Sequence, residues 1–283
     1  EYISGDGTDL TITSGNDIKL AVGAAGSVHS SGSAGTSNTV LGIDAGAILH
    51  ANSDFNVFIG DTVADATMTA TADSNTGVGY AALGALTSGN RNTAVGKDAF
   101  IALTTGQYNV AIGYDAGTAL VGGTHNVIIG DSAGIATTTV DKAVIIGQAA
   151  GGGVLTADAD GTIAIGVEAG NSLTSGQKNV ALGYQALTAN TQGDNSVAVG
   201  YQSLLAQNGV DGEYSNTAVG THSGKAITTG KYSVAIGFEA LLKEDVGNFS
   251  TALGYASLYS QNTASDGTTG NTGLGAYTGL YNV

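Results

Sequence analysis

The sequence predicts an all-β protein, a parallel β-solenoid of about fourteen coils. Three observations support this fold class: a five-residue phrase recurs fourteen times, its closing glycines are usually 17 residues apart, and β-branched residues hold one position of every phrase. A unit of 17 residues is too short for a pair of helices, which needs about 33. It suits one coil with two short strands and two turns. Coils stacked at the strand spacing of about 4.8 Å would make a rod roughly 60 Å long.

The repeat extends through most of the chain. Typical copies are Asn92–Gly96 (NTAVG), Asn109–Gly113 (NVAIG) and Ser233–Gly237 (SVAIG), and departures from the period of 17 are small insertions. Each coil is named here after its repeat glycine. The repeat glycines are Gly42, Gly60, Gly79, Gly96, Gly113, Gly130, Gly147, Gly166, Gly183, Gly200, Gly220, Gly237, Gly254 and Gly275.

Each position of the phrase has its own chemistry. The residue three before the glycine is always β-branched and the residue one before it is always aliphatic. Side chains alternate between two faces along a strand, so we expect these two columns to point together into a dry core. The residue between them is mostly Ala, with Phe58, Ile128 and Ile145 among the exceptions. Ala and the repeat glycine should then face a closely approaching backbone, and we expect a neighbouring chain of a homotrimer there.

Asn opens nine of the fourteen phrases, and stacked Asn side chains can form an amide ladder. The sequence before the repeats differs. Residues 1–35 are expected to form an N-terminal β segment, with strands at 9–13 and 17–21, followed by a Gly/Ser-rich linker. Residues 36–283 are expected to form the solenoid domain.

Composition excludes several classes of function. The chain has 23 acidic and 8 basic residues, a net charge of −15, and no cysteine. Nucleic acid is therefore not an expected partner, because phosphate binding needs clustered Lys and Arg. Disulfides and thiolate metal sites are absent. No apolar stretch approaches the ~18 residues of a membrane span, so no membrane insertion is expected. We also expect no cofactor and no metal site.

The match to a catalytic motif is explained by the repeat itself. Gly130–Gly134 (GDSAG) matches the G-x-S-x-G nucleophile elbow, but the repeat itself supplies this string, since other coils have Asp or Glu in the serine position. We therefore expect no enzyme. Hydrolysis of a polysaccharide by paired carboxylates stays open, because the sequence alone does not place carboxylates across neighbouring coils. Carboxylates two residues after the glycine are expected to form a solvated face rather than a cation site; they are Asp44, Asp98, Asp115, Glu168 and Glu239.

Two groups of residues are candidate surface contacts. Tyrosines follow the repeat glycine in several coils, and their rings either stack on receptor sugars or cover the coil corner or subunit junction. They are Tyr80, Tyr114, Tyr184, Tyr201 and Tyr255. The insertions are the second group, because rods vary by loops on one face. These insertions are 148–161 with Asp158 and Asp160, 202–214 with Asp211 and Glu213, and 257–269 with Asp266.

The phrases Ser233–Gly237 and Asn179–Leu187 resemble the head repeats of YadA-type trimeric adhesins. They are also similar to the longer NTAVGYQAL…TSG arrays of phage tail-fibre proteins. The resemblance covers residues 38–279 and implies a left-handed parallel β-roll in a homotrimer, with the Ala/Gly strand near the threefold axis. Adhesin heads usually have shorter units than the 17 residues found in this chain.

The expected function is that of a phage tail-fibre segment in the virion tail, a rigid trimeric shaft that contributes to host attachment. The opening Gly5–Ile12, which looks like virion-fibre sequence, favours this interpretation. The alternative is a bacterial surface adhesin or extracellular filament. Beyond self-association, the expected partners are a host-surface glycan or an outer-membrane protein. Binding to ice or a crystal surface through Thr arrays ranks last, because the Thr pairs cluster at turns and are missing from several coils.

Overall fold

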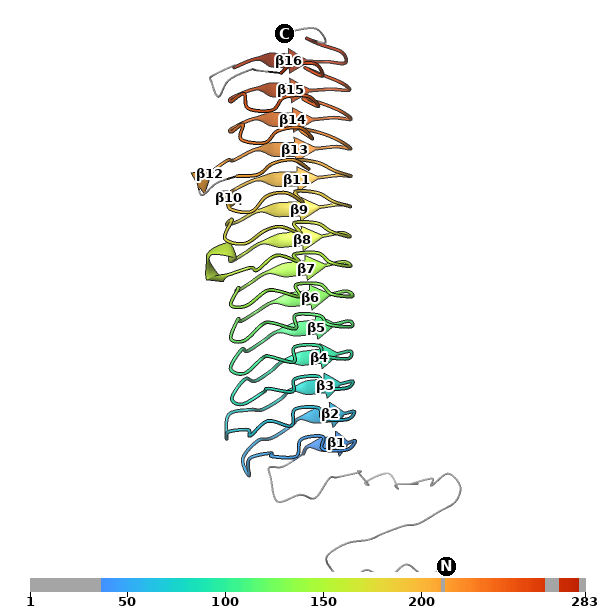
Figure 1. Ribbon diagram of the computed structural model, residues 1–283, viewed down its shortest axis with the longest axis vertical. Coiled ribbons are helices and arrows are strands. Elements are labelled where there is room, and N and C mark those ends of the chain that lie inside the picture. The colour runs from blue at the N-terminus through green and yellow to red at the C-terminus, as the bar shows by residue number, and fades with distance from the viewer. Residues whose placement is uncertain (1–36, 210–211, 263–269, 280–283) are drawn as a thin grey trace, which may run out of the picture.

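The chain folds into a rod of stacked coils, seen from the side in Figure 1. This computed structural model describes residues 37–209, 212–262 and 270–279. The predicted N-terminal β segment and linker therefore lie outside the described residues. Thirteen full turns connect the fourteen strands of one parallel sheet, whose order is β1-β2-β3-β4-β5-β6-β7-β8-β9-β11-β13-β14-β15-β16. The parallel β-solenoid predicted from the 17-residue period is confirmed. Its left-handed sense stays a prediction.

Every strand of the main sheet is three residues long and ends one residue before a repeat glycine. These strands are β1 (Thr39–Leu41), β2 (Val57–Ile59), β3 (Thr76–Val78), β4 (Thr93–Val95), β5 (Val110–Ile112), β6 (Val127–Ile129), β7 (Val144–Ile146), β8 (Ile163–Ile165), β9 (Val180–Leu182), β11 (Val197–Val199), β13 (Thr217–Val219), β14 (Val234–Ile236), β15 (Thr251–Leu253) and β16 (Thr272–Leu274). Successive strands pair without slippage, as Ala111 with Ile128 between β5 and β6. Equivalent positions of the repeat are therefore direct neighbours along the rod.

The prediction of two strands per coil is wrong for most described coils, which have one strand and several turns. Residues two and four after the glycine adopt positive φ, as Asp98 (57°) and Phe100 (51°) do. Left-handed backbone at two nearby positions breaks the extended conformation and turns the chain sharply. Outside the main sheet, β10 (Gly193–Asp194) pairs with β12 (Gly212–Glu213) in the 202–214 insertion.

The orientation of the strands corrects the predicted core. In β5, Ala111 is fully buried inside the coil, whereas Val110 is partly buried and Ile112 is 41% exposed. The same pattern holds in β9 and β14, where Ala181 and Ala235 are buried. The Ala column therefore lines the interior of its own chain, and the branched columns point outward. The sequence analysis had assigned the branched columns to the core and the Ala column to a neighbouring chain, and both assignments are wrong.

The turns explain why small residues lie inside. Large apolar side chains enter the interior from positions four and seven after the glycine, such as Phe100 and Leu103, both fully buried. These side chains fill the coil opposite the strand and leave room only for a methyl group. Where the residue four after the glycine is Gly, the strand can supply the bulk instead. A Cβ on Gly134 would lie 3.3 Å from Cδ1 of Ile128, a large residue in the Ala column.

The repeat glycines are needed for the close approach of successive coils. Gly130 has φ of +135°, and a Cβ there would lie 2.7 Å from the carbonyl oxygen of Gly147. That contact is closer than any real Cβ tolerates, and the φ value also favours glycine. A close backbone approach was predicted correctly, but its partner is the next coil of the same chain.

The predicted Asn ladder is present and buried. The side-chain Oδ1 of Asn92 accepts the backbone N–H of Asn109 at 3.0 Å, and Asn92 Nδ2 donates to the carbonyl of Gly106 at 2.8 Å. Equivalent bonds link consecutive Asn residues from Asn38 to Asn126. Ala143 replaces Asn in the next coil and still donates its N–H to Asn126. Each amide thus satisfies buried backbone groups in two neighbouring coils.

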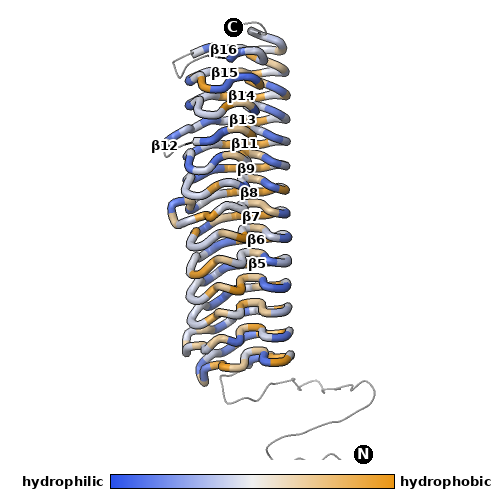
Figure 2. Tube along the Cα trace, viewed as in Figure 1, coloured by the Kyte–Doolittle hydropathy of each residue, from blue (hydrophilic) through white to orange (hydrophobic). Residues whose placement is uncertain are grey.

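Two insertions leave the rod on the same side. The 148–161 insertion contains the short 3₁₀ helix η1 (Ala157–Ala159), and the 202–214 insertion contains β12. Both protrude on the left in Figure 1, away from the corner to which the strand arrows point. Figure 2 shows that hydrophobic and hydrophilic stretches alternate within a coil and recur at similar places along the rod. Of the third insertion, residues 263–269 lie outside the described part.

Candidate functional site: an apolar strand face between two edges

The outward side of the main sheet is an apolar face. We define the strand face as the side chains three and one before each repeat glycine, which point away from the coil interior. The residues one before the glycine are the more exposed: Ile112 and Leu182 are each 41% exposed, and Val219 is 37% exposed. Because register is kept in every strand pair, these side chains form two unbroken columns along the rod.

The size of the strand face distinguishes it from ordinary surface. Three extended residues span about 10 Å and thirteen coil steps about 60 Å, so the face covers roughly 600 Å². Monomeric soluble proteins rarely expose a contiguous apolar patch larger than a few hundred Å². The strand face therefore has the extent and chemistry of a surface that another protein covers.

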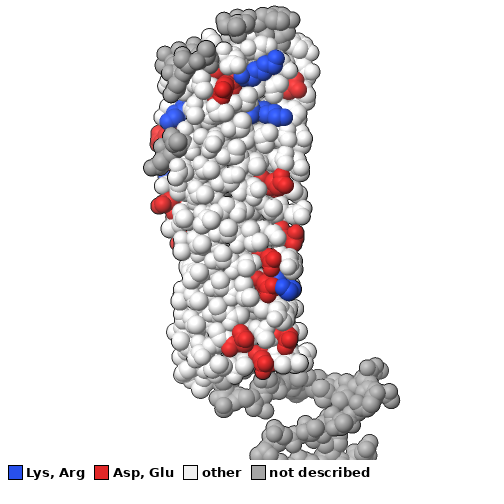
Figure 3. Space-filling model, in the orientation of Figure 1, with Lys and Arg blue, Asp and Glu red and all other residues white. Residues whose placement is uncertain are grey.

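The trailing edge borders the strand face on one side. We define it as the residues one and two after each repeat glycine. In Figure 3, acidic side chains gather along the right-hand edge of the rod, the edge to which the strand arrows of Figure 1 point. Within the described residues, no group of three or more acidic or histidine side chains could hold a metal ion. Of the carboxylates two after the glycine, Asp98 and Asp115 lie in consecutive coils, whereas Asp44, Glu168 and Glu239 lie farther apart along the rod.

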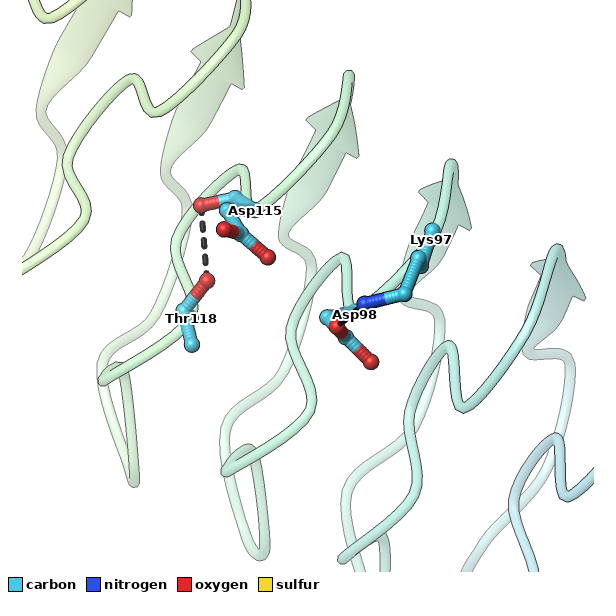
Figure 4. Close-up of polar contacts among 4 residues, drawn as sticks. All are labelled: Lys97, Asp98, Asp115 and Thr118. Atoms are coloured by element: carbon cyan, nitrogen blue, oxygen red, sulfur yellow. Dashed lines mark hydrogen bonds and ion pairs between the residues drawn. The ribbon is translucent and has the colours of Figure 1, made fainter.

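Lys97 organises the trailing edge in the first half of the rod. Its Nζ lies 5.6 Å from the ring centre of Tyr80 and 5.2 Å from that of Tyr114, and it also binds the Asp98 carboxylate. The hydrogen bond to Asp98 raises the pKa of Lys97 above its ordinary value. Figure 4 shows Lys97 reaching Asp98, with Asp115 of the next coil accepting a 2.7 Å bond from Thr118 through its carbonyl. Tyr80 and Tyr114 are thus bridged by a cation.

Aromatic rings form a continuous ladder on the trailing edge of the second half. Tyr184 and Tyr201 stack with ring centres 5.6 Å apart, and His222, Phe238, Tyr255 and Tyr277 continue the series at 5.1, 6.4, 5.3 and 5.2 Å. The predicted contact residues Tyr184, Tyr201 and Tyr255 are therefore brought together. Tyr184 with Tyr201 and Phe238 with Tyr255 cover one another's faces, whereas the other pairs of the ladder are tilted or edge-to-face. Stacking of a sugar needs an open ring face, and this packing favours the alternative that the rings cover a corner or junction.

A row of polar side chains runs beside the first rings of the ladder. The side-chain amide of Gln185 donates to the Glu168 carboxylate at 2.6 Å, and the side-chain amide of Gln202 donates to Oε1 of Gln185 at 2.7 Å. Nζ of Lys225 donates to Oε1 of Gln202 at 2.8 Å and ends the row. The row ties consecutive coils together at the surface.

The leading edge borders the strand face on the opposite side, and sequence reasoning missed it. We define it as the residue five before each repeat glycine. Arg91 lies over the ring of Tyr108 at 5.1 Å, and Tyr108 stacks on His125 at 4.8 Å. Farther along, Tyr232 stacks on Phe249 at 5.2 Å. The signal was available, because aromatic and basic residues recur at this position with the same 17-residue spacing.

The insertion residues lie apart from the strand face. Asp158 is exposed and contributes to a polar recess of about 400 Å³ with Ser175, Gln177 and Gln192. Asp160 is partly buried and accepts the backbone N–H of Asp141 at 2.7 Å, which is a structural role. Glu213 is exposed in β12 and is not among the residues named as lining that recess. Asp211 and Asp266 lie outside the described residues.

The Gly130–Gly134 string is a coil corner rather than a nucleophile elbow. Ser132 has φ of 55° and donates its backbone N–H to the carbonyl of Tyr114. Asp98 and Asp115 occupy the same position and donate to the previous coil in the same way. The string is therefore one copy of a corner that recurs along the rod. No described helix is long and apolar enough to cross a membrane.

Comparison with known proteins gives one relationship. A family model, the YadA head domain repeat, matches two copies at residues 175–203 and 224–240. The first copy contains β9 and β11 and the second contains β14, so the matched stretches are coils of the solenoid. No curated protein and no solved structure matches the chain. The resemblance to YadA-type heads is thereby confirmed for residues 175–203 and 224–240.

Proposed function

We propose that this chain is a non-enzymatic adhesive rod, a homotrimer whose three strand faces pack against one another around an axis parallel to the rod. The observation that carries the proposal is the strand face, a continuous surface at the upper end of the apolar patches that monomeric soluble proteins expose. The surface that meets the sister subunits is then the Val/Ile/Leu columns and not the Ala column.

A cyclic trimer suits the geometry of the strand face. Rotation about an axis parallel to the rod keeps every coil at its own height, so three identical straight faces meet along their full length. Roughly 600 Å² from each protomer is then covered, and the covered centre consists of aliphatic residues with Thr at some positions three before the glycine, largely apolar as in obligate interfaces. Side chains such as Ile112 and Leu182 become the core of the trimer.

The function of such a rod is mechanical and multivalent. Each coil is bonded to the next by strand pairing and by the Asn ladder, so unfolding must break many bonds at once. Three identical side surfaces give avidity to any weak contact with a target. The proposed targets are a host-surface glycan or an outer-membrane protein, met through the insertions or the trailing edge.

Of the two cellular settings, a bacterial surface adhesin has the stronger support. The comparison names the YadA head domain repeat and gives no support to a phage tail fibre. The tail-fibre interpretation relied on the similarity to the longer NTAVGYQAL…TSG arrays and on Gly5–Ile12, which lie outside the described residues. A binding assay with the labelled trimer distinguishes the two settings. Binding to animal cells or their matrix supports the adhesin, whereas selective binding to one bacterial host supports the tail fibre.

Native mass measurement with circular dichroism tests the trimer. The wild-type chain is expected at three times the protomer mass with a β-rich spectrum. Replacing Ile112 and Leu182 with Lys should give a monomer with the same spectrum, because charges on the strand face cannot be covered. Thr105→Lys, on an exposed corner away from the face, is the matched control and should stay trimeric. A monomeric wild-type chain at micromolar concentration would refute the proposal.

A further inference from the structure

Two consecutive coils, those of Gly237 and Gly254, carry aromatic rings on both edges of the strand face. Tyr232 and Phe249 stack on the leading edge with ring centres 5.2 Å apart and planes 12° from parallel. Phe238 and Tyr255 stack on the trailing edge at 5.3 Å and 10°. The four rings are between 41% and 50% exposed. Two of them are phenylalanines, which have no polar group that benefits from exposure.

The two stacks cannot meet within one protomer. Strand β14 (Val234–Ile236) lies between Tyr232 and Phe238, and three extended residues alone separate the two edges by about 10 Å. The rings lie at opposite borders of the same apolar face. What covers them must therefore come from outside the protomer.

We propose that Tyr232 and Phe249 of one protomer pack against Phe238 and Tyr255 of the next, forming a ring-to-ring contact at each of the three subunit junctions. The inference rests on the proposed trimer. When three strand faces surround an axis, the leading edge of each face meets the trailing edge of its neighbour, a head-to-tail contact that closes after three steps. Rotation keeps the height of every coil, so residues of the same coil meet.

Other coils also carry rings or charged groups on both edges. The coil of Gly113 has Tyr108 on its leading edge and Tyr114 on its trailing edge. The coil of Gly130 has His125 opposite Asp131, and the coil of Gly96 has Arg91 opposite the ion pair of Lys97 and Asp98. Rings facing rings, and bases facing groups that include an acid, are the pattern expected where two edges recognise each other.

This contact has a role that the aliphatic strand face does not supply. Val, Ile and Leu recur in every coil, so the strand face by itself fits a neighbour shifted by one or more coils almost equally well. The aromatic stacks occur on both edges at one height in the second half of the rod. They therefore disfavour shifts large enough to move Tyr232 and Phe249 away from the aromatic ladder that runs from Tyr184 to Tyr277 on the trailing edge.

Cysteine cross-linking tests the contact, and the chain has no cysteine of its own to interfere. The double variant Tyr232→Cys with Phe238→Cys, oxidised or treated with a short bismaleimide, should run as a covalent trimer on a denaturing gel. Each single variant should run as a monomer, because a lone cysteine faces the opposite edge of its neighbour. The pair Phe249→Cys with Tyr255→Cys, one coil farther along, should reproduce the result.

The matched control pairs the same two edges at different heights. Tyr108→Cys with Phe238→Cys places the thiols seven coils apart, about 34 Å along the rod, and should not cross-link. Native mass measurement of every variant separates the two proposals. A native trimer whose Tyr232→Cys/Phe238→Cys form stays unlinked overturns the ring contact and leaves the trimer intact. Cross-linked species larger than a trimer, or linkage in the height-mismatched control, would also overturn it, while a native monomer would refute both proposals.

Discussion

Ile145 fills the space that faces Gly151 inside the coil of Gly147. A Cβ on Gly151 would lie 3.2 Å from both Cδ1 and Cγ2 of Ile145, and Ile145 is fully buried. In the coil of Gly96 the sizes are reversed, with Ala94 on the strand and Phe100 four residues after the glycine, both fully buried. In these two coils the large side chain therefore comes from opposite sides of the interior, from the strand in one and from the turn in the other.

Exchanging the two sizes in one coil should conserve stability. Ile145→Ala should cost about 2–5 kcal/mol because it leaves a cavity, and Gly151→Leu should be destabilising because the new side chain meets Ile145. The double variant should be much closer to wild type, since Leu187 occupies that turn position beside Ala181. Denaturation midpoints of the four proteins give the coupling energy. Additive losses would show that the two positions do not share one space.

The Asn ladder should be sensitive to a single deletion. Asn92→Ala leaves the backbone N–H of Asn109 and the carbonyl of Gly106 without their side-chain partner, at a cost of about 2–4 kcal/mol. Asn92→Ser is the matched control, because Ser occupies this position in later coils and Ser233 Oγ accepts the N–H of Ser250 at 3.2 Å. The Ser variant should lose less stability than the Ala variant in chemical denaturation. Equal losses would contradict the assigned role of the side-chain oxygen.

The close approach of the coils should make Gly130 irreplaceable. Gly130→Ala brings a Cβ to 2.7 Å from the Gly147 carbonyl in addition to the strain at φ of +135°, so the loss should exceed about 3 kcal/mol. Gly161→Ala isolates the strain, because Gly161 has φ of +74° with no atom within 4 Å of an added Cβ, and should cost about 1 kcal/mol. Thermal unfolding followed by circular dichroism compares the two. A Gly130→Ala protein as stable as Gly161→Ala would disprove the steric argument.

Tyr255 should titrate above the ordinary tyrosine value of 10.0, because its hydrogen bond with Tyr277 raises its pKa. The folded-state pKa exceeds that of the unfolded chain, so the stabilisation is complete below about pH 10 and is lost as the pH rises through the folded value. Tyr277→Phe should lower the pKa of Tyr255, measured by NMR of labelled tyrosine and assigned with Tyr255→Phe. Tyr80→Phe, far along the rod, should leave that titration unchanged. An unaltered Tyr255 in the Tyr277→Phe protein would be the contrary result.

The architecture could be predicted from the sequence because spacing alone determines it. A base interval of 17 residues, with Gly closing every phrase and Asn opening most of them, leaves few folds that repeat fourteen times. The close approach at the repeat glycine also followed from residue type. Alternation along a strand tells which side chains share a face, but it does not tell which of the two faces is the interior.

The face could not be assigned from the phrase because the deciding residues lie outside it. Phe100 and Leu103 occupy the interior from the turn, and they exclude branched residues from the inner side of the strand. One partial signal did exist: Ile128 and Ile145, two of the large exceptions in the Ala column, each occur in a coil with Gly four residues after the repeat glycine, but three coils with Ala in the column have Gly there as well. Of the two edges of the strand face, only the trailing edge was predicted, from the tyrosines that follow the repeat glycine. The aromatic residues of the leading edge, five before the glycine, were not predicted.

Because successive coils pair in the same strand register and meet at the same repeat glycine, a coil is a repeated module of the rod. Removing or adding one 17-residue unit changes the reach of the rod by about 4.8 Å without altering the surfaces that remaining coils offer each other. The distance at which such a molecule holds its tip from its attachment point is therefore set by copy number, and it can be varied in steps finer than the width of a single sugar ring.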